Sequence, residues 1–187
     1  MEKTITSSAT DTTPRAWIGC LACYNEGRLV GDWFDAATAD EVTTYDVHGA
    51  HSRADLHDEL WCFDYENIPV RGELDPLAAA EWGRVYTEVG PEYWPALCAW
   101  VESGDYVAEG TGLDALPSIS DFEERYYGAW DTCAVYAENL ADDIGLLADV
   151  PEEIAQYFDW SAWTRDLAFD YRVYDDPEGG VFVFRVL

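Results

Sequence analysis

Apolar and polar residues in the first third of the chain follow the strand-like period of two. Residues 16–24 form an apolar run of strand length, the turn NEG follows, and residues 28–35 predict the returning strand of a hairpin. Residues 36–47 predict the start of a helix, and residues 60–66 predict a third strand. Together these elements predict an N-terminal α/β domain with a short antiparallel sheet over residues 14–70.

From residue 71 the period of the pattern changes towards 3.6, which is typical of helices. Residues 77–89 and 92–103 predict two helices separated by a Gly-Pro pair. Residues 105–120 carry glycine and proline at turn positions and are expected to form a connector. The sequence therefore predicts a central helical domain over residues 71–115.

The last segment, residues 116–187, mixes both patterns and predicts an α+β domain. One of its helices is expected to be capped by Asp131 or Thr132 and to end at Gly145. Helical spacing places two sets of residues on opposite faces of this helix: Cys133, Ala137, Leu140 and Ile144 to be buried, and Asp131, Glu138 and Asp142 to be exposed.

Further helix signals and a hairpin complete this segment. Asp149 has the position of an N-cap, with Glu152 at the spacing of a capping box. A short helix after it is expected to turn Trp160, Trp163 and Leu167 inward. The end of the chain predicts a hairpin with its turn at DDPEGG. The whole chain is therefore predicted to be α+β, built from three small domains.

The charge of the chain is its most unusual property. Its 38 acidic and 10 basic residues give a formal net charge of -28, and Lys3 is the only lysine. Aromatic residues make up 15% of the chain, so it has the material for packed cores, unlike an acidic disordered tail. A field of this sign repels nucleic acid and anionic membranes, and no run approaches the ~20 apolar residues of a membrane helix. Charge therefore favours basic protein partners.

The cysteines indicate reduced thiols in a cytoplasmic protein, because their number is odd and no signal-peptide-like run begins the chain. Cys20 and Cys23 have CxxC spacing, yet the run around them predicts a strand, in which residues three apart face opposite sides. No second CxxC completes a four-thiolate zinc site. We interpret these two as buried strand cysteines. The other cysteines are Cys62, Cys98 and Cys133.

Metal and catalytic motifs are weak or absent in the sequence. His48, His51 and His57, with Asp55 and Asp58 nearby, lack a definite ligand spacing, and in so acidic a chain every histidine has a carboxylate near it. No EF-hand loop, P-loop, GxGxxG or GxSxG is present. Carboxylate pairs for glycoside hydrolysis can be drawn almost anywhere. We expect no metal, no cofactor and no catalytic residue.

The acidity has three interpretations. Acidic, lysine-poor surfaces are common in halophilic proteins, and solubility alone needs only ~2 to 8 net charges. In the third interpretation carboxylates stand in for phosphates. Duplex DNA carries about one charge per 1.7 Å, so a net charge of -28 corresponds to roughly 14 base pairs. A groove lined with Lys and Arg for DNA would accept such a surface.

Several stretches resemble the ArdA antirestriction proteins. They are TPRAWIGCLACYNEGRLVGDWFDA near the start, DYE at 64–66, YYGAWDTCAVYAENLADDIG at 126–145, IAQYFDWSAWTRDL after it, and the final VFVFRV. The resemblance extends from about Thr13 to the C-terminus. It implies a DNA mimic carried by mobile elements, which occupies the DNA-binding groove of type I restriction-modification enzymes and protects incoming DNA. It also implies an elongated, curved homodimer of three small domains in a row.

The resemblance places residues 126–145 at or near the dimer contact and on the acidic surface. The chain departs from the family in an N-terminal extension, residues 1–13, which is polar and predicted to be disordered. It also has Cys133, Ala134 and Val135 where family members often have acids, which favours packing or dimerisation there. The dimer-contact candidates are Tyr126, Tyr127, Trp130, Cys133 and Ala137.

The sequence thus predicts a non-enzymatic inhibitor whose exposed acids bind a restriction-modification enzyme. We call the residues nominated for this role the candidate acids. Those expected to reach a motor or other outlying subunit are Asp35, Asp46, Asp64 and Glu66. Those expected to bind the methyltransferase core are Glu88, Glu92, Glu102, Glu123, Glu124, Asp131, Glu138, Asp142, Asp143, Asp149, Glu152, Glu153 and Asp159. The alternative is an acidic, halophile-type interaction protein without DNA-like geometry.

Folding at low salt separates the two interpretations. We expect the chain to keep its far-UV circular dichroism spectrum at about 10 mM ionic strength, where charges act over ~30 Å. A halophilic protein would lose its structure under these conditions and regain it on addition of salt, and that result would contradict the DNA-mimic prediction.

Overall fold

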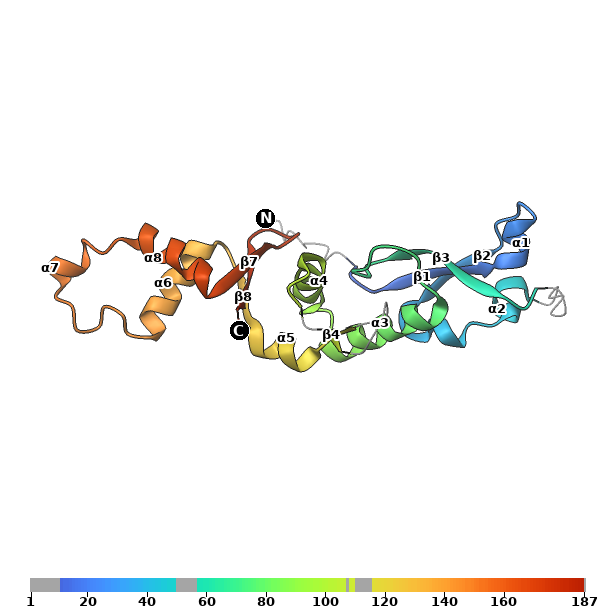
Figure 1. The fold of residues 1–187 in the computed structure, drawn as a ribbon, viewed down its shortest axis with the longest axis horizontal. Helices are drawn as coiled ribbons and strands as arrows, with labels where there is room; N and C mark the ends of the chain where they lie inside the picture. Colours follow the sequence, from blue (N-terminus) through green and yellow to red (C-terminus); the bar gives the residue numbers. More distant parts are fainter. Residues whose placement is uncertain (1–10, 50–56, 107, 110–115, 187) are drawn as a thin grey trace, which may run out of the picture. The chain divides into compact units, whose positions relative to one another are not determined.

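The computed structural model describes residues 11–49, 57–106, 108–109 and 116–186 (Figure 1). Its contacts divide the chain into two compact units, Met1–Trp94 and Pro95–Leu187, which we call unit 1 and unit 2. Each combines helices with small antiparallel sheets, in agreement with the predicted α+β class. The division into three domains remains a prediction. No helix in the described ranges is both long and apolar enough to cross a lipid bilayer.

Unit 1 is built on a three-stranded antiparallel sheet in the order β2-β1-β3 (Figure 1). The strands are β1 (Arg15–Cys20), β2 (Gly31–Asp35) and β3 (Leu60–Glu66). β1 is the central strand and pairs on both edges, and its side chains Ala16 and Ile18 are completely buried. The predicted strands at residues 28–35 and 60–66 are therefore present, and β3 has the predicted bounds.

The prediction that Cys20 and Cys23 lie in one strand and face opposite sides is wrong. The strand β1 ends at Cys20, which becomes the N-cap of a short helix, α1 (Leu21–Asn25). The backbone N–H of Cys23 donates to the Cys20 Sγ at 3.4 Å, so both sulfur atoms lie on the same side of a helical turn. Periodicity alone cannot distinguish a buried strand from a buried helical turn in so short an apolar run.

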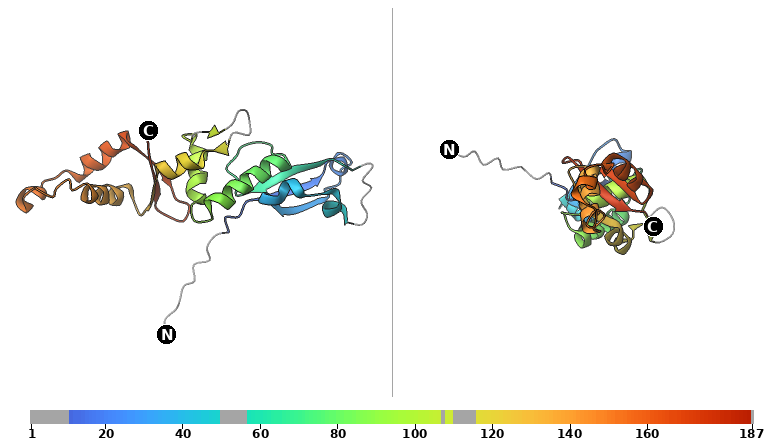
Figure 2. Two further views of the ribbon diagram at one scale, coloured as in Figure 1. Left: turned by 90° about the horizontal axis from the view of Figure 1, so that it is seen from below. Right: turned by 90° about the vertical axis from the view of Figure 1, so that its left-hand side faces the viewer.

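Helices cover one side of this sheet. The predicted helix after residue 35 consists of a 3-10 helix, η1 (Ala36–Glu41), and α2 (Thr44–His48). The long helix α3 (Pro76–Val89) confirms the predicted helix at 77–89 and packs against η1, β1 and β3 (Figure 2). Its buried face is made of Ala79, Ala80, Trp82, Gly83 and Val85.

Unit 2 contains a second three-stranded antiparallel sheet, in the order β6-β8-β7. Its strands are β6 (Tyr126–Trp130), β7 (Tyr171–Asp175) and β8 (Val181–Arg185). β7 and β8 confirm the predicted C-terminal hairpin. The helices are α4 (Trp94–Ser103), α5 (Ile119–Arg125), α6 (Cys133–Asp143), α7 (Glu152–Ala155) and α8 (Trp160–Asp166), with a 3-10 helix, η3 (Leu167–Phe169), and a short strand pair, β4 (Ala108–Glu109) and β5 (Leu116–Pro117).

The strand β8 is buried on both faces, which accounts for its uninterrupted apolar sequence. Phe184 stacks on Trp100 of α4, with ring centroids 5.8 Å apart and an interplanar angle of 9°. Val183 points the other way, into a core cluster with Tyr136, Ala137 and Leu167. Successive strand residues face opposite sides, so this one strand supplies both cores of unit 2.

Three local predictions in unit 2 need correction. The expected connector at residues 105–120 already contains β4, β5 and the start of α5. The N-cap of α7 is Pro151, without a side-chain hydrogen bond, and not Asp149. On α6 the buried residues are Tyr136, Ala137 and Ala141, whereas Ile144 is 58% exposed. Tyr136, which precedes Ala137 of the predicted stripe, fills the core there, so the buried face is rotated about the helix axis.

Gly83 marks the closest approach in unit 1. A Cβ atom at this position would lie 2.1 Å from the Ala37 nitrogen and 2.4 Å from the Ala37 Cα. Alanine is a better helix former than glycine by ~1 kcal/mol, yet overpacking of this kind costs ~1–3 kcal/mol. The contact is with backbone atoms of η1, which cannot rotate away. Close packing of α3 therefore requires glycine here.

We expect Gly83→Ala to lower the free energy of unfolding by about 1–3 kcal/mol, measured by urea titration of tryptophan fluorescence. Glu88→Ala on the same helix is the control, because Glu88 is exposed, and its effect should stay within about 0.5 kcal/mol. A more stable Gly83→Ala protein would show that α3 does not sit this close to η1.

Candidate functional site

Every candidate acid is solvent-exposed in the structure. They lie on both units, on strands, helices and connections alike. Eight of them lie in residues 126–164, which we call the acidic stretch. It contains no other acid and no Lys, Arg or His. Negative charge is thus displayed over a segment that has no positive charge of its own.

Four arginines of the described residues form ion pairs with acids outside the candidate set: Arg28 with Glu26, Arg84 with Asp40, Arg125 with Asp121, and Arg165 with Asp166. Two further arginines bind uncharged groups, since Arg15 lies over the ring of Trp33 and Arg172 donates to the Ala168 carbonyl. Within the described ranges no candidate acid has a basic partner within ion-pair distance. Their charge is left for solvent or another molecule.

Some candidate acids also have a local structural role. Asp35, Asp46 and Asp159 cap η1, α2 and α8 by accepting backbone N–H groups, at 2.9, 2.8 and 2.9 Å. In α2, Thr43 and Asp46 form a complete capping box. The side-chain and backbone hydrogen bonds from Thr43 lower the pKa of Asp46, so this carboxylate stays charged. These acids stabilise helix starts as well as adding charge.

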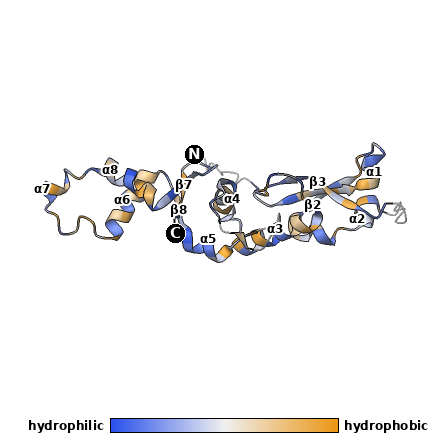
Figure 3. Cartoon of the chain, viewed as in Figure 1, coloured by the Kyte–Doolittle hydropathy of each residue, from blue (hydrophilic) through white to orange (hydrophobic). Residues whose placement is uncertain are grey.

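The acids of α6 are placed where they weaken the helix. Glu138 and Asp142 are four residues apart, a like-charge spacing that costs ~0.2–0.5 kcal/mol. Asp142 and Asp143 lie in the last turn, which has no basic residue, and negative charge at that end opposes the helix dipole by ~0.3–1 kcal/mol. Figure 3 shows hydrophilic and hydrophobic residues side by side on α6. Helix stability therefore does not explain these acids.

The packing under α6 offsets this cost. Tyr136 and Ala137 are buried against Leu167 and Val183, with Trp130, Leu140, Trp163, Tyr171 and Val181 around them. The Trp163 indole N–H donates to the Ala137 carbonyl at 2.9 Å and ties α8 to α6. Leu167 and Trp163 thus turn inward as predicted. The buried side of α6 holds its acidic side in place.

The dimer-contact candidates differ in what they expose. Tyr127 is 37% exposed, while Tyr126, Trp130 and Cys133 are half-buried. Ala137 is completely buried in its own core, so it has no surface for a second chain. Val135, which the sequence set apart from the family pattern, is 42% exposed beside them.

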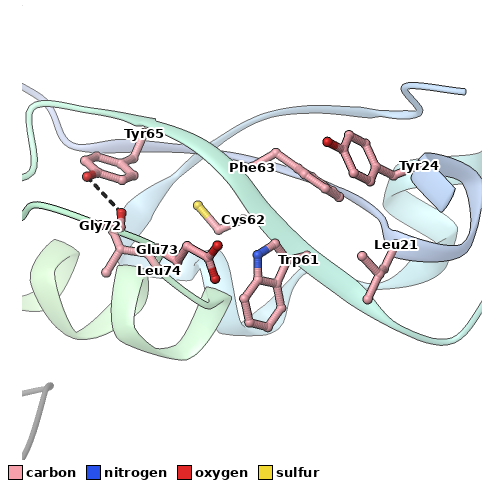
Figure 4. A pocket seen from close by; sticks show the side chains of 9 residues that line it. All are labelled: Leu21, Tyr24, Trp61, Cys62, Phe63, Tyr65, Gly72, Glu73 and Leu74. Atoms are coloured by element: carbon pink, nitrogen blue, oxygen red, sulfur yellow. Dashed lines mark hydrogen bonds between the residues drawn. The ribbon is translucent and has the colours of Figure 1, made fainter. Parts of the chain in front are cut away.

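Unit 1 has a hollow of about 400 Å³, lined by residues of α1, β3 and the segment before α3 (Figure 4). Its lining is mainly aromatic, and its reactive groups are Cys62 and Glu73. Burial raises the pKa of the Cys62 thiol to about 11, and that thiol donates to the Asp64 carbonyl at 3.2 Å. A thiol kept neutral is a weak nucleophile.

One cluster of side chains that can bind a metal ion was not predicted from the sequence. Cys20, Cys23, His48 and His57 converge in unit 1, whereas His51 and Asp55 lie outside the described residues. The CxxC pair was a usable signal. It did not predict a metal site because a strand was expected there, and because no second CxxC completes a four-thiolate site.

Comparison with known proteins gives a match over most of the chain. The model of a family described as antirestriction protein (ArdA) matches residues 16–181. The matched region includes nearly all of β1 at one end and reaches β8 at the other. No curated protein matches the chain.

The capping and the unpartnered acids should differ in their effect on stability. Asp159→Ala removes the cap of α8 and is expected to lower the free energy of unfolding by ~0.5–2 kcal/mol. Asp142→Ala removes only repulsion and is expected to leave stability unchanged or slightly higher. Both effects can be measured by urea unfolding, with Asp159→Asn as the control that keeps a capping oxygen. Equal losses for Asp142→Ala and Asp159→Ala would contradict this division.

Proposed function

Because this chain belongs to the ArdA antirestriction family, we propose that it is a DNA mimic that occupies the DNA-binding groove of a type I restriction-modification enzyme. The observation that carries the proposal is the set of exposed candidate acids without basic partners, and above all the acidic stretch. The protein acts by binding and catalyses no reaction.

The physical basis is the exchange of one polyanion for another. A groove that binds DNA holds Lys and Arg side chains spaced for phosphates, and binding releases counterions from the polyanion. Carboxylates on packed helices are already fixed in space, so little ordering is needed on binding. The long-range field of a chain with a net charge of -28 also steers it towards a basic groove.

Different parts of the chain are assigned to different parts of the enzyme. The acids of the middle and last segments bind the methyltransferase core, so modification is inhibited together with restriction. Asp35, Asp46, Asp64 and Glu66, all on unit 1, reach a motor or other outlying subunit. Two chains join as an elongated homodimer of three-domain subunits through the exposed parts of Tyr127, Val135 and their neighbours, which doubles the length of DNA replaced.

Competition is the direct test of this function. We expect duplex DNA and this protein to exclude each other from a purified type I enzyme in a fluorescence-anisotropy assay. The affinity of the protein for the enzyme should fall steeply with ionic strength, because the contact is between charges. Simultaneous binding without mutual weakening would exclude mimicry and favour the acidic interaction protein as the alternative.

Charge-matched variants test whether position matters beyond net charge. A single change such as Asp142→Asn should weaken inhibition by less than about fivefold, since an exposed ion pair contributes ~0.2–1 kcal/mol. The triple change Glu138→Gln, Asp142→Asn and Asp143→Asn should weaken inhibition by roughly tenfold or more.

The control is the triple change Glu26→Gln, Asp40→Asn and Asp166→Asn, which removes the same charge from acids that already pair with arginine. It should weaken inhibition less than the α6 triple change. Equal losses for the two triple variants would show that net charge alone decides binding and that no phosphate-like placement exists.

A further inference from the structure

Four metal-ligand side chains converge at one end of the sheet in unit 1. Cys20 closes β1, Cys23 lies in α1, His48 ends α2, and His57 stands just before β3. Figure 1 shows α1 and α2 at the same end of the β1–β3 sheet. One ligand atom from each of the four side chains lies within 4.8 Å of all the others. Segments far apart in sequence thus meet at a single point.

The spacing of these atoms fits a tetrahedral zinc ion. Zinc binds thiolate sulfur at ~2.3 Å and imidazole nitrogen at ~2.0–2.1 Å, which sets neighbouring ligand atoms about 3.3–3.8 Å apart. The His57 Nδ1 lies 3.2 Å from the Cys20 Sγ and 3.4 Å from the Cys23 Sγ. These two pairs are already near tetrahedral spacing, and the other pairs, all within 4.8 Å, would close by at most about 1.5 Å around an ion.

Burial and hydrogen bonding point to a ligand as well. Both thiols are 1% exposed. The His48 Nε2 is buried and has no hydrogen-bond partner among the described groups, which is rare for a polar atom inside a protein. The rings of His48 and His57 meet edge to face, with centroids 5.3 Å apart. A cation at the centre would satisfy the unpartnered nitrogen and both sulfurs together.

The backbone around the cluster is held in place independently of any ion. The Cys23 N–H donates to the Cys20 Sγ at 3.4 Å, an arrangement that orients a thiolate ligand. The backbone N–H of Cys20 donates to the Val30 carbonyl and that of Leu21 to the Glu59 carbonyl, both at 3.0 Å. The ligand-bearing turn is thereby anchored to the residue that precedes β2 and to the residue that precedes β3.

We propose that Cys20, Cys23, His48 and His57 bind one zinc ion in a closed structural site. Two thiolates and two imidazoles select zinc over calcium or magnesium, which prefer oxygen ligands. Four protein ligands leave no open position for a substrate, so the ion has no catalytic role. It joins the end of β1, α1, α2 and the start of β3.

A Cys₂His₂ site also suits an acidic surface. The two charges of the ion are cancelled by two thiolates, so a bound zinc adds no net positive charge to the protein. The site can therefore stabilise one end of unit 1 without weakening the negative field. The zinc proposal does not depend on the antirestriction function, and either can fail alone.

Metal analysis of the full chain tests this proposal. The protein, purified without chelator and under reducing conditions, should carry about one zinc ion per chain. Inductively coupled plasma mass spectrometry measures this content. Replacement by Co²⁺ should give the visible bands of a tetrahedral site and a thiolate-to-cobalt charge-transfer band. A chain that stays metal-free with zinc present under these conditions would overturn the proposal.

Variants identify the ligands. Cys23→Ser and His57→Gln should each reduce zinc content at least tenfold, while Cys133→Ser, a thiol of unit 2, should retain it. Chelator treatment of the unaltered chain is a second measurement that does not depend on the folding of a ligand variant. It should lower the melting temperature, and zinc should restore it. Undiminished zinc in both ligand variants, or a melting temperature insensitive to chelator, would contradict the assignment.

Discussion

Mutual repulsion of carboxylates is the constraint under which this protein folds. A net charge of -28 opposes any compact state, and the few arginines in the described ranges neutralise acids other than the candidate acids. Aromatic packing provides the opposing force. Trp94 and Trp100 are fully buried, and the rings of Trp100, Phe122 and Phe184 contact one another. Large rings bury much apolar area per residue, which leaves the surface free for acids.

The acids of the chain therefore fall into groups with different physical roles. Some pair with arginine, some cap helices, and those on α6 do neither and even oppose the helix dipole. Charged residues that lower stability and make no local stabilising interaction are typical of a functional surface. On α6 the acids destabilise the helix, and the burial of Tyr136 and Ala137 on its other side stabilises it.

The sequence predicted much of the fold because many elements have strong local signals. Alternation located β3, the 3.6 period located α3, and turn residues located the β7–β8 hairpin. The errors arose where tertiary contacts decide. Cys20 could not be assigned to a helix start by periodicity, and the ring of Tyr136 displaced the buried stripe of α6.

The candidate site was predictable to a similar extent. Exposure of the acids follows from the cost of burying charge, so it could be expected from composition. The ion pairs could not be predicted, because a pair such as Arg84 with Asp40 joins residues that are far apart in sequence. Only the structure shows which arginine contacts which acid. Convergence of Cys20, Cys23, His48 and His57 likewise requires three segments to be placed in space.

The two-sided burial of β8 makes unit 2 a single cooperative folding element. Phe184 belongs to the aromatic cluster under α4, and the adjacent Val183 belongs to the core under α6. Neither cluster can open without withdrawing the strand that the other requires, so local melting of one is coupled to melting of both. The rigidity of the acidic stretch is thus set partly by uncharged rings at the opposite face of the sheet.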